Sequence, residues 1–279
     1  MPIDPTRIAL LQMTSGISPA ANAVVLSGAV ADAARNGAAM LFTPEMSGLI
    51  DRDRTRAAAH IVAEDDDPVL AAVREAAVRA GIWVHLGSIA VRRSDGRFAN
   101  RGFVIDNEGA IRARYDKLHL FDVDLPTGES WRESAAYAAG VSASVIDTPV
   151  GALGLSICYD LRFPALYGAL SDAGASVLGV PAAFTRPTGV AHWHVLVRAR
   201  AIENACWVVA AAQTGVHEDG RATYGHSLVI DPWGEVVLDM GEGAGLGYAT
   251  IDPARVAEVR RRIPVIDHRR AIPAVTLPR

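Results

Sequence analysis

The segment GALGLSICYDLRFP, residues 151–164, is where an apolar strand changes abruptly into a polar turn. Side chains alternate between the two faces of a β-strand, and one face of this predicted strand carries Leu153, Leu155 and Ile157. Asp160 and Pro164 then predict a turn and the start of a helix. A strand that leads into a helix is typical of α/β folds, and here it places Cys158 at the carboxyl end of the strand.

The same alternation of strands and helices continues on both sides of this segment. Further strands are predicted at 7–14, 40–45, 82–91, 176–182 and 206–213, and helices at 21–38, 68–80, 163–174 and 189–205. The helix over 68–80 is well delimited, because Asp67 can cap it, Pro68 begins it and Gly81 follows its end. Direct turns between strands are predicted within 102–117, 144–158 and 225–240. Together these features predict an α/β fold of mixed sheets covered by helices, with two sheets packed face to face.

The chain shows no internal boundary between domains. No Ser/Gly-rich stretch or charged run divides it, so residues 1–279 are predicted to form a single domain. A last strand and helix are expected over 245–263. From about residue 263 the chain is rich in proline, which predicts an extended tail that can reach a neighbouring subunit.

Composition and charge favour a small-molecule partner. The 279 residues are half hydrophobic and carry a formal net charge of −4, with an isoelectric point near 6.1. Neither value gives a reason to expect nucleic acid or an anionic membrane as partner. The N-terminus lacks a signal-peptide pattern, and no stretch approaches the roughly 20 apolar residues of a membrane span. Two cysteines fit a reducing compartment, so a cytoplasmic location is expected.

Cys158 and Cys206 differ in their surroundings. A thiol at a strand end, near the first N–H groups of a helix, is expected to have a lowered pKa and to face a pocket. The alternative for Cys158 is a buried small hydrophobe, and core packing is the expectation for Cys206 in ENACWVVAAA. His119 is a candidate base or a structural histidine. The HWH triplet is not expected to bind metal, because side chains two residues apart on a helix face different directions.

Two further reactive residues end predicted strands. Glu45 closes AAMLFTPE, and Lys117 closes RARYDK. Either residue alone can be the first solvated residue after a buried strand. Together with Cys158 they form a more specific pattern, because active sites of α/β proteins gather at the carboxyl ends of strands.

These motifs resemble the carbon-nitrogen hydrolases of the nitrilase superfamily. LFTPEMS, RYDKLHLFDVDLPTGESWRES and GLSICYDLRFP are similar to the family's glutamate, lysine and cysteine motifs, in the family's order, and 180–215 and 224–237 extend the likeness. The motifs are most similar to the Nit-type amidases, a branch that includes deaminated glutathione amidase and omega-amidases. The resemblance implies a four-layer αββα sandwich, pairing of protomers into a homodimer or a higher homo-oligomer, and no cofactor or metal. It also implies a triad of Glu45, Lys117 and Cys158, supported by Glu133.

The resemblance further implies thiol-dependent hydrolysis of a small carboxyl-bearing amide, such as deaminated glutathione, to an acid and ammonia through a thioester. Glu45 would move the protons, while Lys117 and the backbone N–H of Tyr159 would stabilise the oxyanion. The expected substrate contacts are Arg162, Phe184, Thr185 and Arg186, where an arginine could bind a carboxylate or form a structural ion pair. Two alternatives remain: a nitrilase with the same triad, and a catalytically silent dimeric binding protein.

Overall fold

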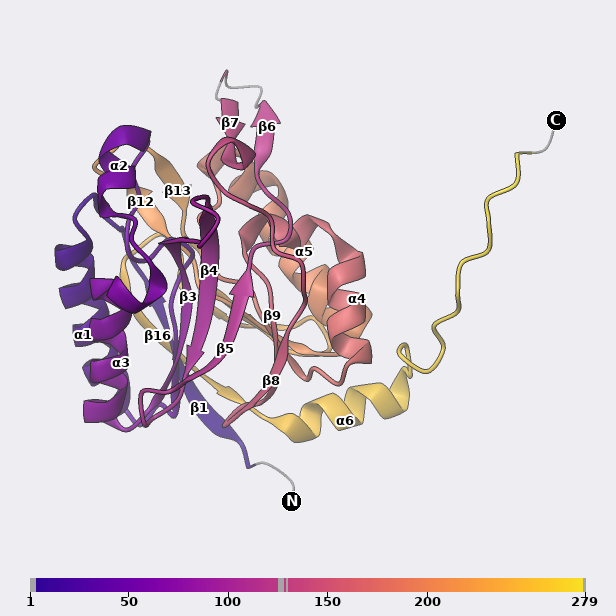
Figure 1. Cartoon of the computed structure of the whole chain (residues 1–279). Coiled ribbons are helices and arrows are strands. Elements are labelled where there is room, and N and C mark those ends of the chain that lie inside the picture. The colour runs from indigo at the N-terminus through magenta and orange to yellow at the C-terminus, as the bar shows by residue number, and fades with distance from the viewer. Residues whose placement is uncertain (1–3, 125–127, 129, 278–279) are drawn as a thin grey trace.

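A first six-stranded sheet forms one half of the central sandwich in the computed structural model, which describes residues 4–124, 128 and 130–277 (Figure 1). Its strands, in spatial order, are β16 (Gly245–Ile251), β1 (Thr6–Gln12), β2 (Met40–Phe42), β3 (Trp83–Arg92), β4 (Phe98–Ile105) and β5 (Ile111–Asp116). Strands β1, β2 and β3 are parallel, and the three outer pairings are antiparallel. The sheet is therefore mixed, as the sequence predicts.

The second six-stranded sheet repeats this plan. Its strands, in spatial order, are β15 (Val236–Asp239), β14 (Leu228–Ile230), β11 (Trp207–Ala210), β10 (Val177–Gly179), β9 (Gly151–Leu155) and β8 (Val145–Thr148). The central strands β9, β10 and β11 are parallel, and β8, β14 and β15 pair in antiparallel fashion. Each sheet thus has a parallel centre whose carboxyl ends lie at one edge.

Helices cover the outer face of each sheet (Figure 1). The first sheet is covered by α1 (Pro19–Arg35) and α3 (Pro68–Ala80), and the second by α4 (Pro164–Asp172) and α5 (Arg186–Asn204). As predicted, Asp67 caps α3 by accepting a 2.8 Å hydrogen bond from Leu70 N, and Gly81 ends that helix in the left-handed region. The layer order of helices, sheet, sheet and helices is the predicted αββα sandwich.

Strand β1 shows how the sequence divides the core into layers. Its side chains Ile8 and Leu10 are fully buried between the two sheets, where they pack with residues of the second sheet. Ala9 and Leu11 point the other way and pack under α1 and α3. An uninterrupted apolar run is therefore required here, because this strand is buried on both faces.

Several short elements have no counterpart in the sequence prediction. They are α2 (Arg54–His60), η1 (Glu64–Asp66), η2 (Glu133–Ala135), η3 (Cys158–Arg162), and the hairpins β6 (Asp122–Asp124) with β7 (Ser130–Arg132) and β12 (Thr214–Val216) with β13 (Ala222–Tyr224). Between the strands of the first hairpin, residues 125–127 and 129 of the predicted lysine motif lie outside the described residues. Most of these elements lie at the edge of the sandwich where the parallel strands end (Figure 1).

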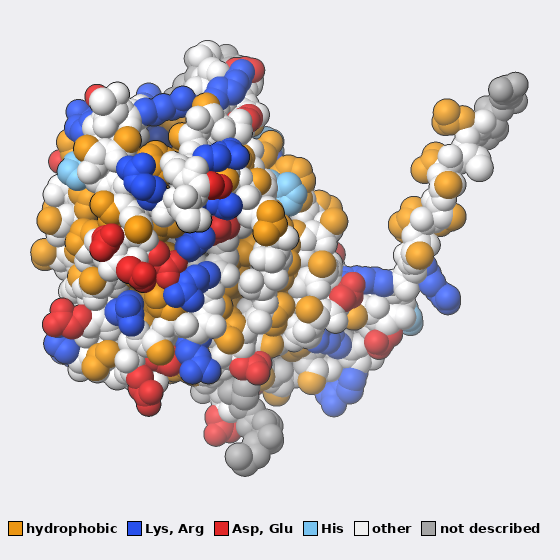
Figure 2. Space-filling model, in the orientation of Figure 1, with side chains coloured by type: hydrophobic (Ala, Val, Ile, Leu, Met, Phe, Trp, Pro, Cys, Tyr) orange, Lys and Arg blue, Asp and Glu red, His pale blue; other side chains and the backbone are white. Residues whose placement is uncertain are grey.

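The chain leaves the sandwich after α6 (Pro253–Arg262). Arg269 still contacts the body, where it hydrogen-bonds Gly168 O and Asn204 Oδ1 at 2.9 and 2.7 Å. Residues 271–277 are exposed and extend away from the body, and Figure 2 shows apolar side chains along this segment. Of the predicted tail, 278 and 279 lie outside the described residues. Within the described ranges, no helix combines the length and hydropathy that a membrane crossing requires.

Candidate active site

The two sheets bring the three predicted reactive residues to one place. Glu45 follows β2 and Lys117 follows β5 in the first sheet, whereas Cys158 follows β9 in the second. Strands β2 and β5 run in the same direction, so both side chains emerge at the same edge of their sheet. All three residues are buried, with 4, 2 and 8% of their surface exposed. The site therefore lies at the junction between the sheets.

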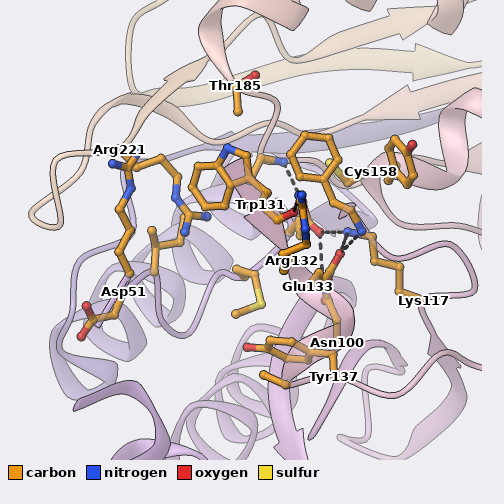
Figure 3. Close-up of a pocket in the computed structure, with 18 of the residues that line it drawn as sticks. Asp51, Asn100, Lys117, Trp131, Arg132, Glu133, Tyr137, Cys158, Thr185 and Arg221 are labelled. Atoms are coloured by element: carbon orange, nitrogen blue, oxygen red, sulfur yellow. Dashed lines mark hydrogen bonds and ion pairs between the residues drawn. The ribbon is translucent and has the colours of Figure 1, made fainter. Parts of the chain in front are cut away.

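Lys117 lies between two carboxylates (Figure 3). Its Nζ is 2.8 Å from Glu45 Oε1 and 2.9 Å from Glu133 Oε2. Asn100 on β4 donates hydrogen bonds to the same two side chains, at 2.9 Å to Glu45 Oε1 and 3.1 Å to Glu133 Oε1. The other oxygen of Glu45 accepts a hydrogen bond at 2.9 Å from the backbone N–H of Ala183, in the segment between β10 and α5. The ammonium group is thus fixed on both sides.

Two residues at the site have left-handed backbone conformations, which residues other than glycine rarely adopt. Cys158 has φ = 49°, and Met46, next to Glu45, has φ = 55°. The left-handed region costs such residues about 1–2 kcal/mol, and strain of this kind concentrates at functional sites. A close approach of β3 holds the Glu45 segment: a Cβ at Gly87 would lie 2.1 Å from Thr43 O. Position 87 therefore requires glycine.

A buried carboxylate holds the turn that carries the thiol. Asp160 Oδ2 accepts hydrogen bonds from Ile157 N and Tyr115 Oη, both at 2.8 Å. Its Oδ1 accepts from His119 N at 3.0 Å and from His119 Nδ1 at 2.7 Å. The His119 ring also stacks on Phe163, with 3.6 Å between ring centroids. His119 therefore binds Asp160 and has the structural role, whereas the carboxylate that accepts a hydrogen bond from the thiol belongs to Glu45.

The buried charged groups of the site stabilise one another in their charged forms. Burial opposes the charged form of Lys117, but Glu133 and Glu45 raise its pKa well above the usual 10.5. Burial likewise opposes ionisation of Glu45, yet the Lys117 ammonium and a hydrogen bond from the Cys158 thiol hold the pKa of Glu45 below the usual 4.5. The resting site consequently contains two charged partners, Glu45 and Lys117, and a neutral thiol.

The expectation of a lowered thiol pKa is wrong for this resting state. Burial, followed by the negative charge of Glu45, raises the pKa of Cys158 well above the usual 9.0. The ammonium of Lys117 acts in the opposite direction but does not prevail. The sulfur can therefore become a thiolate only when its proton passes to a neighbouring base.

A cavity of about 390 Å³ opens in front of the thiol. Among the predicted substrate contacts, Arg162, Phe184 and Thr185 line it, and Tyr159, the expected backbone oxyanion donor, lines it as well. Arg186 does not, and its exposed guanidinium lies 2.9 Å from Glu242 Oε1 instead. Of the two readings of Arg186, the geometry matches the structural ion pair, because the residue begins α5 on the outside of the cavity.

The cavity wall contains residues that the sequence analysis did not single out. Arg221 comes from the turn between β12 and β13, and Trp131 comes from β7. The Arg221 guanidinium carbon lies 4.4 Å from the centroid of the Trp131 ring. Arg221 Nε and Trp131 Nε1 are buried and have no hydrogen-bond partner among the described residues. Figure 3 shows both on the opposite side of the pocket from Lys117. The Asp219–Gly220 pair was a signal for this hairpin, because such dipeptides favour tight turns.

Comparisons with known proteins identify the family of the chain. Residues 7–261 match the family model described as carbon-nitrogen hydrolase. The chain is 38% identical over 269 residues to a deaminated glutathione amidase of Yersinia enterocolitica, a match that covers 95% of this chain and 93% of that protein.

Two solved structures are similar along nearly the whole chain. The crystal structure of Caenorhabditis elegans NitFhit has a TM-score of 0.89 and 40% identity, and the match covers 97% of this chain and 66% of NitFhit. This chain therefore spans about two thirds of NitFhit. A mutant amidase of Nesterenkonia sp. AN1, with the acetamide moiety of fluoroacetamide covalently added at its active-site cysteine, has a TM-score of 0.78 and 28% identity, over 92% of this chain and 96% of that one.

The family match and the similar structures confirm the resemblance found in the motifs. The family model spans more than nine tenths of the chain, and the fold is that of the nitrilase-superfamily structures. Proteins of this kind act on carbon–nitrogen bonds other than peptide bonds. The chain belongs to the carbon-nitrogen hydrolase family.

Proposed function

We propose that the protein hydrolyses a small carboxyl-bearing amide through a thioester on Cys158. The observation that supports this most directly is the shared buried site of a carboxylate, an ammonium group and a thiol. Lys117 Nζ lies 2.8 Å from Glu45 Oε1, and the Cys158 thiol donates a hydrogen bond to the same carboxylate. Acyl transfer needs a nucleophile, a proton carrier and a charge that stabilises the oxyanion, and the site offers one residue for each.

Attack on the amide begins with a proton transfer. Glu45 accepts the thiol proton as the sulfur bonds to the carbonyl carbon, since the raised pKa of Cys158 disfavours a free thiolate in advance. The carbonyl oxygen becomes an oxyanion, which Lys117 and the N–H of Tyr159 stabilise. Tyr159 lies in the first turn of η3, where N–H groups lack partners within the helix. A charge-assisted hydrogen bond is about twice as strong as a neutral one, so Lys117 provides the larger part of the oxyanion's stabilisation.

Collapse of the tetrahedral intermediate returns the proton. Glu45 protonates the leaving nitrogen, the carbon–nitrogen bond breaks, and the acyl group remains on Cys158 as a thioester. Glu45 then takes a proton from water as the water oxygen bonds to the thioester carbon. The carbon–sulfur bond breaks, Glu45 returns the proton to the sulfur, and the acid leaves. Glu133 and Asn100 do not need to touch the substrate, because their hydrogen bonds hold Lys117 and Glu45 in position.

The substrate is proposed to carry a carboxylate. Deaminated glutathione is the first candidate, because similar proteins are named deaminated glutathione amidase. The amide nitrogens of that peptide-like acid carry a substituent, so the leaving group would be an amine, whereas a primary amide would release ammonia. Arg162 is one proposed carboxylate contact, and its guanidinium lies over the ring of Phe184 in the cavity wall. Thr185 offers a hydroxyl at the same wall.

Arg221 is a second proposed carboxylate contact. Its buried Nε has no hydrogen-bond partner within the part of the chain that the structure describes, and its ion pair with Asp219 is long, at 3.7 Å. Burial lowers the pKa of Arg221, so an additional anion would favour the charged guanidinium. Arg221→Ala is expected to raise KM for a carboxyl-bearing amide at least about tenfold while changing KM for a neutral amide little. Equal effects on both substrates would contradict this assignment.

The decisive test is mass spectrometry of the protein after incubation with short carboxyl-bearing amides. We expect an acyl adduct on Cys158 whose mass identifies the acid half of the substrate. Cys158→Ala should fold and lose both adduct and turnover, while Cys206→Ala, at a buried cysteine packed in the core, should keep them. Turnover in Cys158→Ala would refute the mechanism.

Two further assays, ammonia release from nitriles and alkylation of the thiol, help to separate the alternatives. A nitrilase would release ammonia from nitriles and leave the corresponding amides unchanged. A catalytically silent binding protein would form no acyl adduct, and a thiol-directed alkylator would fail to label Cys158 selectively.

We also propose that the protein is a cytoplasmic homo-oligomer. Both cysteines are free, which fits a reducing compartment. Val190 and Val195 on α5 are 67 and 69% exposed, and the tail adds exposed Ile272 and Val275. Burial of these exposed apolar side chains against a second subunit would stabilise an oligomer. Light scattering that finds a monomer at micromolar concentration would refute the oligomer.

A further inference from the structure

A cluster of two histidines and one aspartate lies outside the active-site cavity, at the outer helix of the second sheet. His194 comes from α5, His226 from the segment between β13 and β14, and Asp239 is the last residue of β15. His194 Nε2 lies 3.0 Å from Asp239 Oδ2, and His226 Nδ1 lies 2.9 Å from Asp239 Oδ1. One ligand atom from each residue lies within 4.8 Å of the other two.

His226 is held in one orientation by its surroundings. Its backbone is in the left-handed region, with φ = 53°, which is costly for a residue other than glycine. Its N–H donates to Gly241 O at 2.6 Å, and its C=O accepts from Trp193 Nε1 at 2.7 Å. The ring stacks on Tyr224 with 4.5 Å between centroids. The imidazole therefore cannot turn freely away from the cluster.

The other members of the cluster are also supported. Asp239 Oδ1 accepts a hydrogen bond from Gly241 N at 2.9 Å. Tyr224 lies directly against α5, because a Cβ at Gly189 would be 2.2 Å from Tyr224 Cγ. His194 projects from the same helix, which is anchored to the cluster by Trp193. Ligands of a metal are commonly oriented by outer hydrogen bonds of this kind.

We propose that His194, His226 and Asp239 bind one Zn²⁺ ion. Two neutral imidazole nitrogens and a carboxylate oxygen match the ligands that zinc takes, at about 2.0–2.2 Å. Donors of one tetrahedral zinc lie roughly 3.3 Å apart. The two histidines now contact different oxygens of Asp239, at 3.0 and 2.9 Å, and one ligand atom from each residue lies within 4.8 Å of the other two, so rotations of the side chains bring all three to one ion. The side chains are 33, 22 and 33% exposed, so water can occupy the fourth position.

The site differs from the histidine pair that the HWH triplet suggests. His192 accepts a hydrogen bond from Arg162 Nη2 at 3.2 Å, toward the cavity, whereas His194 faces Asp239. The two side chains therefore go to different partners, as expected for residues two apart on a helix. The ligands that complete the site come from β15 and the segment before β14. An ion at this point would connect α5 to both.

The test uses untagged full-length protein that carries Cys158→Ala, so that the reactive thiol cannot bind the probe. Co²⁺ replaces Zn²⁺ as a spectroscopic probe, and Zn²⁺ is then titrated in competition. His194→Gln removes one metal ligand but keeps an amide that can hydrogen-bond Asp239. His60→Ala, an exposed histidine on α2, is the matched control. Far-ultraviolet circular dichroism checks that every variant is folded.

We expect one Co²⁺ per chain with visible absorption bands of nitrogen and oxygen ligation, displaced by one equivalent of Zn²⁺. His194→Gln and Asp239→Asn should each weaken binding at least about tenfold, and His60→Ala should not change it. Zn²⁺ should also raise the melting temperature of the parent protein and not that of His194→Gln. No stoichiometric binding at micromolar metal, or equal binding by folded His194→Gln, would show that the cluster is only a hydrogen-bonded triad and would overturn the proposal.

Discussion

Asp160→Asn tests whether the buried carboxylate positions the thiol. Asp160 is fully buried and its two oxygens accept four hydrogen bonds, two of them from the backbone N–H groups of Ile157 and His119. Asparagine has one acceptor oxygen and one donor nitrogen. The Tyr115 hydroxyl can rotate and the His119 ring can change tautomer, but the two backbone donors cannot adapt. Whichever way the amide turns, one backbone N–H loses its acceptor.

The expected cost follows from that single orphaned donor. A buried donor without a partner costs about 1–3 kcal/mol of unfolding free energy. For a chain of this length, this corresponds to a melting temperature lower by roughly 2–6 °C. Ile157 N directly precedes Cys158, so the strained turn that carries the sulfur should shift as well. A displacement of about 1 Å can cost up to about a hundredfold in rate, and we expect kcat to fall by about 10- to 100-fold.

The assay combines urea unfolding with steady-state kinetics on the best amide substrate. Asp172→Asn is the matched control, because the Asp172 side chain is 56% exposed in its ion pair with Arg269 and its substitution should change the free energy of unfolding by less than about 0.5 kcal/mol. If Asp160→Asn is as stable as the control, the inference that one backbone N–H loses its acceptor is wrong. If it is less stable but retains full kcat, Asp160 supports the fold without positioning the nucleophile.

Three further predictions concern the charges of the site and its rim. Glu133→Gln should fold and lose much of kcat, because Lys117 keeps one carboxylate partner of two; full activity would remove Glu133 from the mechanism. Arg186→Ala should leave KM within about twofold, since the side chain lies outside the cavity, and a large rise in KM would place it in the substrate path. Although burial opposes ionisation of Glu45, Lys117 holds its pKa below 4.5, and burial and Glu45 hold the pKa of Cys158 above 9.0. A profile of kcat/KM against pH should therefore be flat between about 5 and 9, falling below that range as Glu45 gains a proton, and a limb near neutrality would contradict it.

Local sequence signals were sufficient to predict most of the fold. The cap at Asp67, the proline at 68 and the glycine at 81 delimit α3 without any tertiary information. Long apolar runs likewise predict the central strands without tertiary information, because a strand buried on both faces must be apolar throughout. The hairpin of β12 and β13 was missed because its strands are three residues each, too short to show a periodic pattern.

The candidate site was predicted in part, for a physical reason. Glu45, Lys117 and Cys158 each end a strand, and this position is visible in the sequence. Asn100 lies within β4 and Arg221 within a surface-like turn, and their roles depend on contacts with residues 55 and 90 positions away, respectively. Local sequence patterns carry no information about contacts between residues so far apart in the chain. From the sequence, Asn100 is therefore indistinguishable from any strand residue, and Arg221 from any turn residue.

The division of the reactive groups between the two sheets has a consequence for inactivation. The proposed nucleophile, Cys158, follows a strand of one layer of the sandwich, and its proposed proton acceptor and cation, Glu45 and Lys117, follow strands of the other. A slight sliding of the layers would separate sulfur from carboxylate while leaving the ladders within each sheet intact. Moderate heat or hydrostatic pressure should thus abolish turnover before the far-ultraviolet circular dichroism spectrum changes. The catalytic rate would then report sensitively on the alignment of the two layers.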